Sequence, residues 1–156
     1  MRRCRIAGLA AFLAVSASLC TARDLAVVSN KGNTVGGLAQ AELVKLSKGE
    51  MPRWPDGKPV TFIMRPPSTP EMRIMLEKVY ELPAPQVSEL ISTANHGRAN
   101  HPAVVIANSD EDLVNKVASL PGAVGVVDVY AINSSVTVVK VAGKLPLEPG
   151  YLLHGN

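Results

Sequence analysis

The stretch VTFIMRPPSTPEMRIMLEKVY, residues 60–80, contains the three parts from which the fold is built. Four of its first five residues are apolar and two of these four are β-branched, which is typical of a short buried strand. Its last nine residues, 72–80, place apolar side chains at i, i+3, i+4 and i+7, and this period predicts an amphipathic helix. The repeated residues are Met72, Met75, Leu76 and Val79. The proline-rich turn RPPSTPE, residues 65–71, joins the two, so we expect a strand–turn–helix unit.

The same alternation runs through the rest of the chain. Further strands are expected at residues 25–29, 103–107, 123–127 and 136–141. Further helices are expected within residues 38–50, 87–94 and 109–120. Short apolar strands that alternate with amphipathic helices predict an α/β fold, with a mostly parallel sheet flanked by helices. We expect one domain over residues 23–142, followed by a loosely attached C-terminal tail, residues 143–156.

Residues 1–22 have the order of regions of a secretory signal peptide. Three arginines fall within the first five residues, an apolar block follows, and small residues lead to Ala22. The apolar block is shorter than the roughly 20 residues that span a bilayer, so we expect removal after Ala22 and no membrane span in the product. Lipidation at Cys20 is the weaker alternative, because the large Leu19 stands where a lipoprotein signal needs a small residue. These features predict a periplasmic or secreted protein.

Cysteine usage and charge limit what the exported product can be. Both cysteines, Cys4 and Cys20, lie in the expected signal peptide, so no disulfide is expected and stability must come from packing. Three of the 16 basic residues also lie there, and the remainder carries 13 basic and 13 acidic residues. A neutral product argues against nucleic acid as a partner.

Catalytic and metal-binding patterns find no match in the chain. A hydrolytic nucleophile would need a Cys or Ser with a His partner, but no GxSxG or HExxH motif and no paired Cys/His spacing occurs. His96 and His101 stand five apart in a Gly/Pro-rich loop, where solvated histidines are more common than metal ligands, and His154 lies in the tail. We therefore expect no enzyme, no metal site and no cofactor.

The turn after the second strand is the candidate binding site. In α/β folds ligands bind beyond the carboxyl ends of the strands, and an arginine, two hydroxyls and a helix start there could hold an anion. The candidate residues are Arg65, Ser68 and Thr69. The alternative is a plain helix start, with Thr69 as N-cap and Pro70 at the first helical position, and the residues alone favour it.

The direction of the Arg65 side chain separates these two interpretations. A guanidinium that points into an open concavity would support an anion site. One that pairs with Glu71 or another acid would support the helix cap.

Several segments together resemble the phosphate-binding-protein-like family, the solute receptors of phosphate ABC transporters with a type II periplasmic-binding fold. The matching segments are LAVVSNKGN (25–33), ELVKLSKGEMPRWPDG (42–57) and PGAVGVV (121–127). That family has two lobes that close on the ligand, whereas this chain resembles a single lobe. The resemblance therefore implies half of a binding clamp and weak binding.

The resemblance also implies ligand-binding residues. In the receptors an arginine and a Ser-Gly-Thr turn hold phosphate, and Arg65 and Ser68 match the first part of this pattern. Thr69 and Pro70 stand where the glycine and the second hydroxyl are expected, and Asn30 matches a loop residue that faces the cleft. The implied function is weak binding of phosphate or a related oxyanion in a transport or sensing system. The alternative is a non-catalytic scaffold that binds another envelope protein or pairs with itself.

Overall fold

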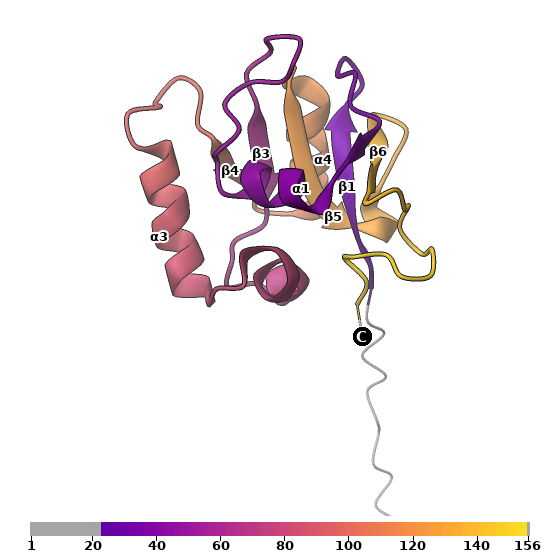
Figure 1. The fold of residues 1–156 in the computed structure, drawn as a ribbon. Helices are drawn as coiled ribbons and strands as arrows, with labels where there is room; N and C mark the ends of the chain where they lie inside the picture. Colours follow the sequence, from indigo (N-terminus) through magenta and orange to yellow (C-terminus); the bar gives the residue numbers. More distant parts are fainter. Residues whose placement is uncertain (1–22, 156) are drawn as a thin grey trace, which may run out of the picture.

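The computed structural model describes residues 23–155, so the expected signal peptide lies outside the described residues. Six strands form one sheet in the order β2-β6-β1-β5-β3-β4 (Figure 1). They are β1 (Leu25–Asn30), β2 (Gly37–Leu38), β3 (Thr61–Met64), β4 (Val104–Ile106), β5 (Ala123–Asp128) and β6 (Val136–Val141). The five expected strands are confirmed. The sixth, β2, has only two residues and contains no apolar run that could have predicted it.

Strand direction is parallel except around β1. Strand β3 pairs in parallel with β4 and β5, and β2 pairs in parallel with β6, but β1 lies antiparallel to both β5 and β6. The expected mostly parallel sheet is confirmed, with its first strand reversed. The carboxyl end of β1 therefore lies at the opposite edge of the sheet from the carboxyl ends of β3, β4 and β5.

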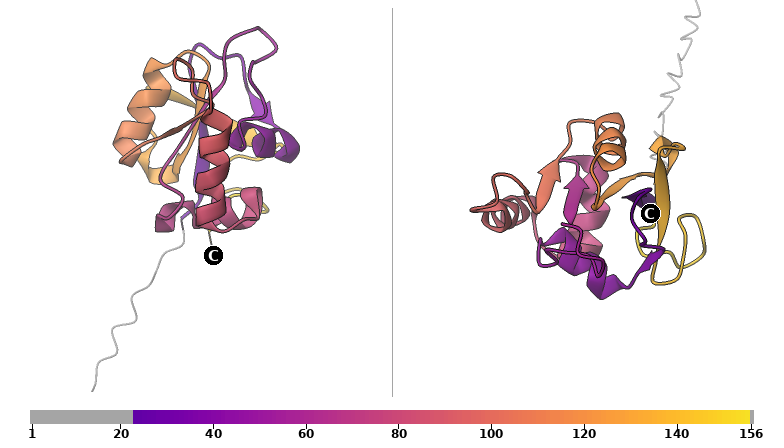
Figure 2. Two further views of the ribbon diagram at one scale, coloured as in Figure 1. Left: turned by 90° about the vertical axis from the view of Figure 1, so that its left-hand side faces the viewer. Right: turned by 90° about the horizontal axis from the view of Figure 1, so that it is seen from above.

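Helices cover both faces of the sheet, as expected. They comprise α1 (Gln40–Ser47), the 3₁₀ turn η1 (Pro70–Met72), α2 (Arg73–Met75), the π turn η2 (Leu76–Tyr80), α3 (Ala84–Asn95), α4 (Asp110–Ser119) and the 3₁₀ turn η3 (Val129–Ala131). Figure 2 shows α4 on one face and α1 on the other. Each face has its own apolar core, which packs against α4 on one side and against α1, η2 and α3 on the other.

The apolar repeat after β3 forms the expected helix, which is continuous from Pro70 to Tyr80 but changes from 3₁₀ through α to π hydrogen bonding along its length. Met72, Met75 and Val79 are buried, so the predicted apolar face is correct. The π turn adds Tyr80 to the same core, where its hydroxyl donates to the Ser47 carbonyl oxygen at 2.7 Å. This tertiary hydrogen bond accompanies a wider turn that the apolar period alone does not predict.

The tryptophan loop and the turn before β5 hold each other in place. Trp54 is buried and covers the core under its loop, and its Nε1–H donates to the Gly122 carbonyl oxygen at 2.8 Å. Gly122 has a φ of +85°, and a Cβ there would lie 2.0 Å from the Pro59 carbonyl oxygen. Only glycine allows this left-handed conformation and this close approach together.

The C-terminal residues pack onto the domain, so the expectation of a loosely attached tail is wrong. Tyr151 and Leu153 are buried in the core, and the Leu25 backbone N–H donates to the Leu153 carbonyl oxygen at 3.0 Å. Burial raises the pKa of the Tyr151 hydroxyl above its ordinary value. The described ends of the chain therefore meet at one edge of the sheet (Figure 1).

A buried carboxylate fixes this tail. Asp24 is 2% exposed and accepts hydrogen bonds from the backbone N–H of Leu147 at 2.8 Å and of Gly155 at 3.4 Å. The Nδ1 of His154 lies 2.6 Å from the Asp24 Oδ1. Three groups of the tail thus converge on one side chain next to β1.

Candidate functional site

Arg65 directly follows β3 and its guanidinium is paired with an acid. Its Nη1 donates to the Asp110 Oδ1 at 3.1 Å, and the two side chains are 16% and 29% exposed. Asp110 begins α4 shortly after β4, which is the neighbour of β3 in the sheet. Parallel neighbours end at the same edge, so both residues are brought together there. By the direction of its guanidinium, Arg65 favours the helix-start interpretation of the turn.

The pairing leaves part of the guanidinium unused. Arginine carries five N–H donors. The Arg65 Nε is buried and has no hydrogen-bond acceptor among residues 23–155. A buried donor without an acceptor costs about 1–3 kcal/mol. Asp110 therefore leaves one donor of the guanidinium unsatisfied, and because this donor is buried, an anion reaches it only if Arg65 or its neighbours move.

The two candidate hydroxyls of the turn differ. The Thr69 Oγ1 donates to the Pro66 carbonyl oxygen at 2.7 Å, and Thr69 stands immediately before η1 with Pro70 at the first position. This is the arrangement that the helix-start interpretation predicts, although the Thr69 side chain caps no backbone N–H. Ser68 is exposed at the same turn. The hydroxyl of Ser68 is thus open to a ligand, whereas the proton of the Thr69 hydroxyl is already used.

The helix start adds little positive potential. Pro70, the first helical residue, has no N–H. The N–H groups of Met72 and Arg73 already donate to the carbonyl oxygens of Thr69 and Pro70. The expected cluster of backbone amides that would hold an anion is therefore weak here.

Asn30 does not lie beside Arg65. Because β1 runs antiparallel to β5, its last residue lies at the opposite edge of the sheet. The Asn30 Nδ2 donates to the carbonyl oxygens of Val117 and Ala118 at 2.9 Å each, and its Oδ1 accepts from the Gly32 N–H at 2.8 Å. Its amide ties the loop after β1 to the end of α4, so its role here is structural.

Asp110 lies in the helix that was expected within residues 109–120, but it was not expected to be the partner of Arg65. A usable signal was present. Arg65 and Asp110 both follow apolar runs that were expected to be strands, and strands joined through a helix are commonly parallel neighbours. An acid and a base at the carboxyl ends of neighbouring strands are placed to pair.

The histidines form no cluster in the structure. His96 and His101 are exposed in the loop between α3 and β4, and His154 contacts Asp24. Among residues 23–155, no group of three or more His, Cys, Asp or Glu side chains could hold a metal ion. Within this same range, no helix is long and apolar enough to cross a membrane.

Comparison with known proteins gives structural likeness only. No family model and no curated protein matches the chain. An ABC-type phosphate transport receptor from Vibrio cholerae superposes with a TM-score of 0.68 at 17% identity, covering 85% of this chain and 54% of the receptor. PstS from Borrelia burgdorferi gives a TM-score of 0.64 at 14% identity, over 86% of this chain and 55% of that one.

A third solved structure has the same fold. A phosphate-binding protein from Stenotrophomonas maltophilia has a TM-score of 0.59 at 18% identity, over 80% of this chain and 40% of its own. The resemblance to phosphate receptors is thus confirmed at the level of the fold. The chain spans about half the length of the receptors that it matches, as a single lobe would.

Proposed function

We propose that this chain is an exported, non-catalytic binding module of the phosphate-receptor type, which contacts phosphate or a related oxyanion weakly through Arg65 and Ser68. The observation that carries the proposal is the turn after β3, which holds both the Arg65 side chain, 16% exposed, and the exposed Ser68. The structures with the same fold are phosphate-binding or phosphate-transport proteins by name, and the planar guanidinium fork of an arginine can donate to two phosphate oxygens at once.

Asp110 makes this binding weak. Its carboxylate holds the Nη1 of Arg65 and adds negative charge beside any incoming anion. An oxyanion must displace this carboxylate or share the guanidinium with it, and either event opposes binding. Removal of the negative charge at Asp110 should therefore strengthen binding, whereas removal of Arg65 should abolish it.

Isothermal titration calorimetry with phosphate and with sulfate tests the proposal. The wild type should bind with millimolar affinity, Arg65→Gln should give no heat, and Asp110→Asn should bind about tenfold more tightly, since a charge-assisted hydrogen bond contributes about 1.5–3 kcal/mol. Arg73→Gln is the matched control, because Arg73 lies on α2 with its side chain 80% exposed and paired with Glu77. Equal heats for wild type and Arg65→Gln would overturn the oxyanion assignment.

A second candidate function is a scaffold or interaction module without a ligand. Three of the four candidate binding side chains form hydrogen bonds within the protein, and this favours a module without a ligand. The Arg65 guanidinium bonds to Asp110, the Thr69 hydroxyl to Pro66, and the Asn30 amide to α4. Absence of heat from both wild type and Asp110→Asn at millimolar phosphate would select this function. Light scattering after gel filtration would then show whether the chain pairs with itself.

A further inference from the structure

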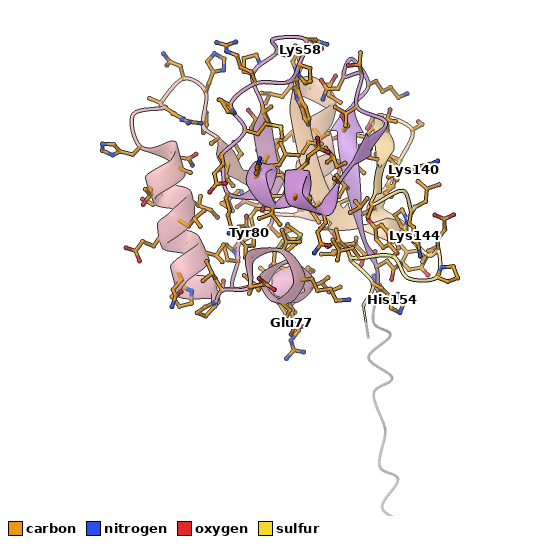
Figure 3. All side chains as sticks on the ribbon, in the orientation of Figure 1. Lys58, Glu77, Tyr80, Lys140, Lys144 and His154 are labelled. Carbon is orange, nitrogen blue, oxygen red and sulfur yellow. The ribbon has the colours of Figure 1, made fainter. Side chains whose placement is uncertain are left out.

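A groove of about 490 Å³ lies at the edge of the sheet opposite Arg65. Its walls come from the proline-rich loop at residues 52–59, just before β3, and from the loop at residues 97–101, just before β4. Figure 3 shows Lys58 at this edge of the molecule, with Glu77 and His154 at the other. The groove is therefore separate from the candidate oxyanion site.

The groove is lined by arginines that do not pair with an acid. Of the five arginines in residues 23–155, three pair with a carboxylate: Arg23 with Asp128, Arg65 with Asp110 and Arg73 with Glu77. The other two line this one groove.

These two arginines are Arg53 and Arg98, and both are exposed. The Arg53 Nη1 donates to the Gly57 carbonyl oxygen at 2.9 Å, which holds the guanidinium beside its own loop without neutralising it. His101 completes the ionisable lining, and no carboxylate lines the groove. The lining is thus positively charged, although the chain after residue 22 is neutral as a whole.

Nearby acids do not cancel this charge. Asp56 lies on the same loop as Arg53, but its Oδ2 is 3.4 Å from the Lys58 Nζ, so one positive charge on that loop offsets it. Glu50 lies two residues before the proline-rich loop and lines a different groove. The potential at this edge is therefore positive, and exposed positive charge attracts acidic partners over a distance of about 10 Å at moderate salt.

We infer that this groove is a docking site for an acidic peptide segment of a partner protein. The charged groups are spread over two exposed loops, and this arrangement suits several carboxylates along an extended segment. A single small oxyanion would need converging, buried donors. Pro52 and Pro59 add apolar wall between the charges, against which the backbone of such a segment can pack.

Fluorescence anisotropy with a labelled short polyglutamate peptide tests the inference. The wild type should bind it, polylysine should not bind, and affinity should fall as salt rises. The double variant Arg53→Glu/Arg98→Glu should bind at least about tenfold more weakly, since each reversal replaces an attraction by a repulsion. The control Arg73→Glu/Lys140→Glu makes the same change in net charge at exposed positions outside the groove and should bind like wild type.

Three results would overturn the inference. One is an equal loss of peptide binding in both double variants, with native circular dichroism, because net charge alone would then explain it. Another is displacement of the peptide by millimolar inorganic phosphate at constant ionic strength, which would indicate a small-anion site. The third is Arg53- and Arg98-dependent binding to phosphatidylglycerol vesicles without peptide binding, which would indicate a membrane surface. Arg65→Gln should leave peptide binding unchanged. The peptide assay therefore tests the groove independently of the calorimetric test of the oxyanion site.

Discussion

Replacement of Asp24 by Asn should lower the free energy of unfolding by about 2–4 kcal/mol. The Asp24 carboxylate is 2% exposed and accepts a backbone hydrogen bond from Leu147 at 2.8 Å, and it contacts the His154 Nδ1 at 2.6 Å. The side-chain amide of the variant keeps one acceptor oxygen, but its NH₂ group then faces a group that the carboxylate had contacted. At least one charged hydrogen bond is then lost, at about 1.5–3 kcal/mol, and a buried donor remains unsatisfied.

Urea unfolding at neutral pH measures this loss, and Asp56→Asn is the matched control. Asp56 is an exposed loop aspartate, so its change should cost less than about 1 kcal/mol. Amide hydrogen exchange gives a second readout, because the Leu147 N–H should exchange faster in Asp24→Asn if the tail loosens. A double-mutant cycle with His154→Ala should show coupling. Stability within about 0.5 kcal/mol of wild type, with Leu147 still protected, would refute the view that this carboxylate holds the tail.

Two further changes test the turns and caps of the fold. Gly122→Ala should cost about 2–4 kcal/mol in urea unfolding, because the new Cβ would lie 2.0 Å from the Pro59 carbonyl oxygen; Gly57→Ala, also at positive φ but in open space, should cost less. The pKa of Asp112 lies below its ordinary value of 3.8, because Lys116 and the Asn108 N–H bond to its carboxylate. The stability that this group contributes is present above pH 3.8 and is lost as pH falls through the lowered pKa. In Asp112→Asn the free energy of unfolding should therefore depend less on pH below 3.8. A steeper loss of stability with falling pH in Asp112→Asn would contradict the assignment of the lowered pKa to the hydrogen bonds from Lys116 and Asn108.

Local patterns predicted the elements of this fold well, because every strand except β2 is a short apolar run and most helices carry their own apolar periodicity. The chief errors concern long-range contacts. The tail after residue 142 appeared loose, since nothing near it in sequence indicates that Asp24, 123 residues before Leu147, accepts its hydrogen bond. The helix after β3 was expected to be regular, but burial of Tyr80 against Ser47 accompanies a π turn.

The candidate site shows the same limit. Asn30 was assigned to the site through the family resemblance alone, and no local pattern in residues 25–30 shows that β1 runs against its neighbours. The antiparallel pairing of β1 moves Asn30 to the other edge. Ser68 and Thr69 were correctly expected at the turn after β3, because that turn is local. The partner of Arg65 was missed because Asp110 lies 45 residues later and meets it only through the pairing of β3 with β4.

The position of β1 sets the order in which the molecule can be assembled. Among the six strands of residues 23–155, β1 is synthesised before the others, yet its neighbours in the sheet are β5 and β6, with Leu25 opposite Asp128. All six of its residues are buried in the finished sheet. A nascent chain that ends before residue 123 thus exposes an apolar ribbon with two unsatisfied edges, and closure over such sequence separations is slow. The centre of the sheet can therefore form only after β5 and β6 have been synthesised.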